Sequence, residues 1–317
     1  MPEQMKPSAF IFFLTFFISS AQAQYIFRIS GDGLDKPSFI LGTIHVLPAS
    51  LLDSVPDYQE VEAQCQQMFI EFLPTEEMLH PDIESLLSVE PKPRERLKYP
   101  DGKNIFDFID KESADILKAK FKEIIPLNLD DPKWKEIRSW QPADFQDFLL
   151  RPIRKQTREN LMQGAGVSNT AMDFVLMQRA KERGLEVFGL DDEDRSAEEM
   201  VSAQFQAPPT IEAQADSLMA FLKNYEERKA KLIEEPLALC NYWKARDFEG
   251  FTRYYLPKAS QYTVLLKERN ETWFPKMQTA MRQKPTLFIF GSAHLIGEYG
   301  IIHLLRSSGY KVEQIKK

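Results

Sequence analysis

Residues 39–46 read FILGTIHV, and residues 288–295, near the other end of the chain, read FIFGSAHL. Each segment is an apolar run followed by glycine, a small hydroxyl residue, one further residue and histidine. The chain contains four histidines in all, and His45 and His294 occupy the matching positions. Because glycine lets the backbone turn sharply, we interpret each segment as a buried strand with a histidine just beyond its carboxyl end.

The paired histidines predict a common site. Open sheets with flanking helices bind ligands at the carboxyl ends of their strands. If the two strands are neighbours, both imidazoles reach one crevice, and imidazole is the commonest metal ligand in proteins. A single segment of this kind would indicate a structural histidine, but two near copies favour a shared metal site.

Two carboxylates are candidates to complete this site, since a catalytic ion usually has three protein ligands and one open position. Glu71 lies in the apolar run 68–73, where a charge is costly unless it is paired or bound to metal. Asp191 follows the strand-like run 186–190. The alternatives are a buried arginine partner for Glu71 and a helix N-cap for Asp191. Such mixed ligands suit zinc, manganese, cobalt or iron(II) without choosing among them.

Arg269 and Asn270 form another candidate pair, shortly before the second histidine strand. An arginine can stabilise an oxyanion or hold a substrate carboxylate. The alternative is a surface ion pair with Glu268 or Glu271.

The predicted elements indicate an α+β fold with an α/β-like core. It consists of a central mixed β-sheet flanked by helices, with a helical insertion or cap at about 75–161, in one domain spanning 24–317. The predicted strands are 25–30, 38–42, 68–73, 186–190, 286–290 and 310–315, with the first two as a hairpin. The predicted helices are 55–67, 112–125, 143–150, 170–184, 211–245, 262–282 (interrupted or entered at Pro275) and 297–308, with a flexible joint at 164–166.

Composition and the N-terminus restrict the function. The 317 residues carry a net charge of -7 with no basic block, which disfavours a nucleic-acid partner. An apolar block at 9–18 precedes SSAQA at 19–23, so 1–23 is predicted to be a signal peptide cleaved after Ala23. The block is shorter than the roughly 20 apolar residues of a spanning helix. We therefore expect a periplasmic or secreted protein with no stable membrane anchor. Cys65 and Cys240 are interpreted as buried free thiols, although an oxidising compartment would permit a disulfide.

These residues resemble the TraB/GumN family, which includes the TIKI metalloproteases. The family's hallmark is a pair of G-x-x-H motifs near the two ends of the domain, here GTIH at 42–45 and GSAH at 291–294. Glu71 matches the family's acidic residue at the end of the next strand, and the pair at 269–270 matches an Arg-Asn pair. The chain departs from the family at 189–192, where GLDD replaces Gly-Leu-Glu-Thr, which leaves the role of Asp191 open.

The resemblance implies a metal-dependent hydrolase, since TIKI-type relatives are peptidases that manganese or cobalt supports. We expect a peptide or protein substrate and a divalent metal (manganese, cobalt or zinc). The expected metal ligands are His45, His294, Glu71 and Asp191; the catalytic residues are Glu71 and Arg269; the substrate-binding residues are Arg269 and Asn270. One alternative is a non-catalytic binding protein for a peptide, a metal or haem. Another is a partner protein whose paired segments are only core strands.

Overall fold

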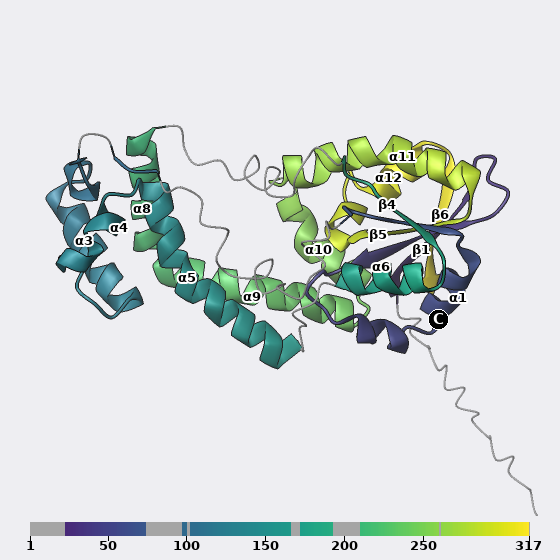
Figure 1. Cartoon of the computed structure of the whole chain (residues 1–317), viewed down its shortest axis with the longest axis horizontal. Coiled ribbons are helices and arrows are strands. Elements are labelled where there is room, and N and C mark those ends of the chain that lie inside the picture. Colours follow the sequence, from purple (N-terminus) through teal and green to yellow (C-terminus); the bar gives the residue numbers. More distant parts are fainter. Residues whose placement is uncertain are drawn as a thin grey trace, which may run out of the picture.

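A mixed six-stranded sheet lies at the centre of the computed structural model, which describes residues 23–73, 97–99, 102–165, 172–192, 210–259 and 261–316 (Figure 1). The strands are β1 (Ala23–Gly31), β2 (Ser38–Thr43), β3 (Gln67–Ile70), β4 (Glu186–Gly189), β5 (Thr286–Gly291) and β6 (Tyr310–Lys316). Their order across the sheet is β4-β3-β5-β2-β1-β6. The fold is therefore α+β, as the sequence predicts.

The two histidine strands are neighbours. β2 pairs with β5 in parallel, and β3 and β4 continue the parallel part of the sheet beyond β5. β1 runs antiparallel to both β2 and β6, which confirms the predicted hairpin. Every residue of β2 and β5 is buried, which explains why both sequences are unbroken apolar runs rather than alternating ones.

Helices surround this sheet. The α-helices of the described residues are α1 (Pro56–Gln64), α3 (Lys111–Ile124), α4 (Lys135–Arg138), α5 (Pro142–Asn160), α6 (Met172–Glu182), α8 (Ile211–Lys223), α9 (Tyr225–Lys244), α10 (Phe248–Ala259), α11 (Arg269–Gln283) and α12 (Ile301–Ser307). In Figure 1, α11 and α12 lie above the sheet, and α1 and α6 lie below it. The strands thus have their apolar runs covered, and the carboxyl ends of the parallel strands β2, β3, β4 and β5 meet at one edge.

A second cluster of buried side chains lies outside the sheet. It is formed by α3, α5 and α8, with Phe121, Phe145 and Leu218 fully buried in it. Figure 1 shows these helices at the left of the molecule, away from the strands. The described part of residues 97–165 is mainly helical, with one isolated β-bridge between Lys98 and Trp140, and α8 joins it from later in the chain.

Helix α9 packs into both clusters. Tyr225 at its start belongs to the second cluster, whereas Cys240 and Trp243 near its end belong to the cluster around the sheet. The indole Nε1 of Trp243 donates a hydrogen bond of 2.8 Å to the carbonyl oxygen of Gly42. α9 therefore connects the second cluster directly to the end of β2.

Several predicted boundaries are wrong. The predicted helix 211–245 is two helices that meet at Asn224, and the predicted helix 297–308 begins only at Ile301, after a 3-10 helix at Ser292–Leu295. A π-helix at Thr263–Glu268 leads into α11, which continues through Pro275. α10 was not predicted at all. The failure has a physical reason: local propensity does not show where tertiary packing ends a helix.

Two further predictions concern joints and helix length. The predicted helix 143–150 extends to Asn160, and Leu161–Ala165 form a π-helix directly after it rather than a loop. The predicted helix 55–67 stops at Gln64, because Gln67 already begins β3. The last residue of the predicted joint, Gly166, lies outside the described residues.

The predicted signal peptide also lies outside the described residues, except for Ala23 at the start of β1. The same holds for His80 and for the whole of the predicted insertion before residue 97. Among the helices that the structure describes, none combines the length and the apolar character needed to cross a bilayer. Cys65 and Cys240 are buried and free, as expected.

Candidate functional site

The two G-x-x-H segments meet at the carboxyl edge of the sheet, but they are not symmetric. In the register of the paired strands, Thr43 of β2 lies opposite Gly291 of β5, so the two motifs are offset by one residue. His294 lies in the 3-10 helix after β5 and its side chain is 4% exposed, whereas the side chain of His45 is 48% exposed. One imidazole is therefore enclosed and the other opens to solvent.

Glu71 lies between the two imidazoles. It follows Ile70, the last residue of β3, and does not lie inside a longer strand as the sequence suggested. Its Oε1 atom accepts a hydrogen bond of 2.6 Å from the backbone N–H of Gly291. The same oxygen is 3.6 Å from His45 Nε2 and 3.8 Å from His294 Nε2. The fold thus brings three of the predicted site residues together from three strand ends.

Arg269 bridges the two predicted carboxylates. Its Nη2 donates to Glu71 Oε2 at 2.7 Å and to Asp191 Oδ2 at 2.9 Å, and its Nε donates to Asp191 Oδ1 at 3.1 Å. Trp273, one helical turn further along α11, lies under the guanidinium at 4.5 Å and donates to Asp191 Oδ1 at 2.8 Å. Arg269 is therefore a buried cation and does not form the surface ion pair considered from the sequence.

Asn270 fixes the ring of His294. Its side-chain Nδ2 donates to the carbonyl oxygens of His294 and Tyr299, so its Oδ1 must be the acceptor that faces His294 Nδ1 at 2.7 Å. The hydrogen of His294 is therefore on Nδ1, and the bare Nε2 atom accepts from Arg269 Nη1 at 3.3 Å. Asn270 is 1% exposed and holds the ring on its Nδ1 side, opposite Glu71.

Asp173 plays the corresponding part for His45. His45 Nδ1 donates to Asp173 Oδ2 at 2.8 Å, which leaves His45 Nε2 facing Glu71. Sequence reasoning missed this residue, because an acid in the first turn of a predicted helix is common and carries no functional signal of its own. It also missed Trp273, for which the spacing of four residues from Arg269 was the available signal.

The surroundings move the pKa values of these groups apart. Desolvation opposes the charge of His45, but the carboxylates of Asp173 and Glu71 outweigh it and raise its pKa to about 9. Burial, supported by the charges of Arg269 and His45 and opposed by Glu71, lowers the pKa of His294 to about 3. Desolvation would raise the pKa of Glu71, but Arg269 and then the two histidines hold it far below its usual range. At neutral pH, Glu71 is therefore an anion and His294 is neutral.

The donor atoms suit a divalent metal. Each imidazole has its Nδ1 held by an acceptor, as is usual for metal-binding histidines, and each Nε2 faces Glu71 Oε1. Ligand atoms at about 2 Å from one ion lie roughly 3–4 Å apart, which matches the separations of both nitrogens from this oxygen. Among the described residues, however, no three His, Cys, Asp or Glu side chains are arranged closely enough to hold a metal ion. Arg269 donates to His294 Nε2 and so occupies the atom that would bind an ion.

Asp191 is less suited to bind metal than the other predicted ligands. Its side chain is 6% exposed, and both oxygens accept hydrogen bonds from Arg269, with Trp273 sharing one of them. These contacts hold Arg269 in place.

If the groups beside Gly291 act on a substrate, replacement of Gly291 by alanine is expected to lower the reaction rate up to about a hundredfold without unfolding the protein. A Cβ atom at this position would lie 3.1 Å from His45 Nε2 and 3.2 Å from Glu71 Oε1, so both groups would have to move. A misplacement of reacting groups by about 1 Å can cost about a factor of 100 in rate, which sets the upper limit of the effect. The backbone of Gly291 (φ -56, ψ 135) suits alanine, so the effect is steric.

The matched control for Gly291→Ala is Gly189→Ala. Gly189 also ends a parallel strand, but its Cβ would approach Leu73 instead of the histidines. Turnover and thermal unfolding of both variants provide the measurement. Equal turnover in Gly291→Ala and wild type would show that the space beside Gly291 has no role.

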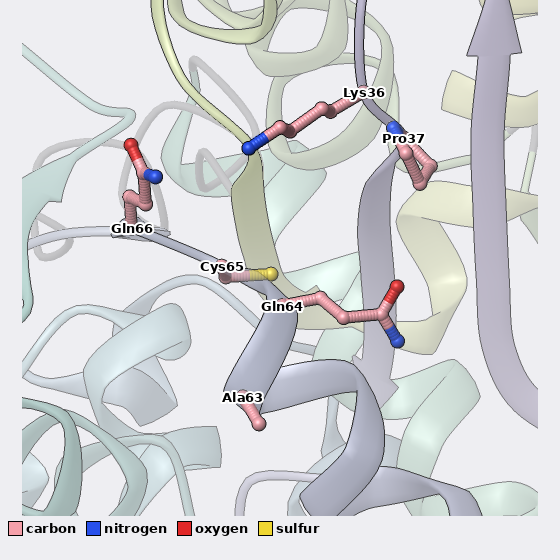
Figure 2. A pocket seen from close by; sticks show the side chains of 6 residues that line it. All are labelled: Lys36, Pro37, Ala63, Gln64, Cys65 and Gln66. Atoms are coloured by element: carbon pink, nitrogen blue, oxygen red, sulfur yellow. The ribbon is translucent and has the colours of Figure 1, made fainter.

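A hollow at the opposite edge of the sheet does not share this chemistry. Figure 2 shows its lining, formed by Lys36, Pro37 and residues 63–66, at the amino ends of β2 and β3. Burial raises the pKa of the Cys65 thiol to about 12, so this sulfur is not a nucleophile at neutral pH. The carboxyl edge with the two imidazoles remains the candidate site.

Residues 25–314 match the model of the TraB/PrgY/gumN family. Neither the comparison with curated proteins nor the comparison with solved structures gave a match.

Proposed function

The chain belongs to the TraB/PrgY/gumN family, and we propose that it is a metal-dependent hydrolase that cleaves peptides. One observation carries the proposal: both imidazoles have Nδ1 held by an acceptor, so that both Nε2 atoms face the same oxygen of Glu71. Two histidines and one carboxylate form a common ligand set of catalytic metal sites. Export through the predicted signal peptide, 1–23, would place the reaction outside the cytoplasm.

His45, His294 and Glu71 would hold the ion. When it is bound, a divalent metal lowers the pKa of a water molecule and polarises a carbonyl group. His294 is neutral, so its Nε2 can bind metal without first losing a proton. A general base works best when its pKa is near the working pH. The low pKa of Glu71 therefore favours the role of ligand over that of general base.

Arg269 would stabilise an oxyanion of the substrate. Two carboxylates already neutralise its charge, which disfavours the alternative that it anchors a carboxylate of the substrate. Its Nη1 donor points toward His294 Nε2, on the side where Glu71 and the imidazoles converge. Once Nη1 releases His294 Nε2 to the ion, this donor would be free to stabilise developing negative charge.

Substrate would approach from the side of His45. The side chain of His45 is 48% exposed, whereas the side chains of His294, Glu71, Arg269 and Asp191 are each at most 10% exposed. The enclosed groups thus form the base of the site, and His45 lies at its opening.

A peptidase assay with manganese, cobalt and zinc, each added separately after chelator treatment, tests the proposal. Wild type is expected to hydrolyse peptides only with metal, and His45→Ala is expected to lose this turnover at limiting metal because one ligand is missing. His303→Ala is the control, since His303 is exposed on α12 and its ring Nε2 is hydrogen-bonded to the hydroxyl group of Ser307, away from the site. Metal-independent hydrolysis, or equal turnover in His45→Ala, would exclude the proposed mechanism.

A further inference from the structure

Helix α6 holds His45 at two points. The carboxylate of Asp173, in the first turn of α6, accepts from the ring Nδ1 at 2.8 Å. The backbone N–H of Met172, the first residue of the same helix, donates to the carbonyl oxygen of His45 at 2.7 Å. The ring and the backbone of a half-exposed histidine are thus both tied to a helix that has one face buried in the core.

The contact of Asp173 with His45 is not explained by helix stability alone. Asp173 is 6% exposed, and its Oδ1 has no hydrogen-bond partner among the described residues. A buried carboxylate oxygen without a partner costs free energy. An exposed acid in the first turn would favour the helix dipole without this cost. The burial of Asp173 therefore serves the contact with His45.

Resting on the proposed function, we propose that Asp173 is a positioning residue that fixes the His45 ring with Nε2 toward Glu71, and so prepares this atom to bind the metal. Without Asp173, the half-exposed ring can rotate into solvent and present either nitrogen. His294 has the same support from Asn270, but there the ring is already enclosed. Asp173 therefore fixes the orientation of the exposed His45 ring, whereas burial already restrains the ring of His294.

Metal affinity is the first measurement. In Asp173→Ala, binding of manganese and cobalt is expected to weaken about 10- to 100-fold, the usual effect of removing a hydrogen-bond partner of a ligand. Asp173→Asn keeps an acceptor for Nδ1 and is expected to recover part of the affinity. The matched control is Asp144→Asn, because Asp144 is a buried acid (3% exposed) in the first turn of α5 and accepts from the backbone of Leu97. This control is expected to bind metal as wild type does.

A double-mutant cycle separates positioning from general stability. If Asp173 acts through His45, Asp173→Ala should change metal affinity in wild type but not in the His45→Ala background. An equal loss in both backgrounds would overturn the inference, because Asp173 would then act independently of the ring.

A second readout requires no metal. In chelator-treated, ¹⁵N-histidine-labelled protein, the Nδ1–H of His45 is expected to give a slowly exchanging proton resonance that His45→Ala removes. This resonance should also disappear in Asp173→Ala and remain in Asp144→Asn. Its persistence in Asp173→Ala would overturn the inference about Asp173 and leave the proposed function intact. Wild type that shows the resonance but binds none of the metals would instead remove the proposed function, and with it the purpose assigned to the contact.

Discussion

Replacement of Arg269 by methionine is expected to lower the free energy of unfolding by about 3–5 kcal/mol, the cost of leaving a buried charge without its partner. Arg269 is the cation shared by Glu71 and Asp191, and the three side chains are at most 10% exposed. Methionine fills a similar volume over Trp273 but leaves two buried carboxylates facing each other. Urea unfolding of the metal-free protein gives the measurement.

Arg282→Met is the matched control for this variant. Arg282 lies on the same helix and pairs with Asp32 at 3.1 Å, but the two side chains are 59% and 36% exposed. A surface ion pair contributes about 0–1 kcal/mol, so little change is expected. Adding Asp191→Asn to Arg269→Met should restore part of the stability, because it removes one of the unpaired charges. Similar losses of unfolding free energy in both arginine variants would show that the buried ion pairs of Arg269 contribute no more than a surface ion pair.

Replacement of Glu71 by glutamine is expected to reduce peptide turnover about 10²- to 10⁴-fold, whether the carboxylate serves as a base or as a ligand. The change keeps the volume and an acceptor for the N–H of Gly291, but it removes the negative charge that faces both imidazoles. The low pKa of Glu71 favours the ligand role, so metal affinity should fall together with turnover. If metal affinity is unchanged while turnover is lost, Glu71 would instead be the general base.

Glu62→Gln provides the comparison for Glu71→Gln. Glu62 is a buried glutamate (5% exposed) on α1 that pairs with Arg183 and accepts from Tyr58, away from the carboxyl edge of the sheet. Its replacement should affect stability but not turnover per folded molecule. If turnover falls equally in both variants, the loss reflects folding and not chemistry.

The residues of the candidate site could be chosen from the sequence because their signals are local. Gly42 with His45 and Gly291 with His294 repeat one pattern, and Glu71 interrupts an apolar run where a charge requires a reason. The partners of these residues could not be chosen in this way. Asp173 becomes adjacent to His45 only when α6 packs under the sheet, and nothing in its own neighbourhood in the sequence distinguishes it from other acids near a helix start.

The fold shows the same division between local and distant information. The strands β2, β3 and β5 are short and apolar, so their positions follow from the sequence, whereas the parallel pairing of β2 and β5 was only a condition of the shared site and is supplied by the structure. The break at Asn224 and the continuation of α11 through Pro275 depend on which hydrophobic cluster each helix face meets. The ion pairs between Arg269 and the two carboxylates also join distant segments of the chain. The sequence therefore allowed either a metal or an arginine as the partner of Glu71 and could not distinguish between them.

The one-residue offset between β2 and β5 accompanies an unequal exposure of the two histidines, which would set the order in which a ligand meets them. An incoming ligand reaches the half-exposed ring of His45 before it can reach His294, which is closed off until Arg269 gives up its hydrogen bond. A ligand of this site would therefore have to enter and leave past His45.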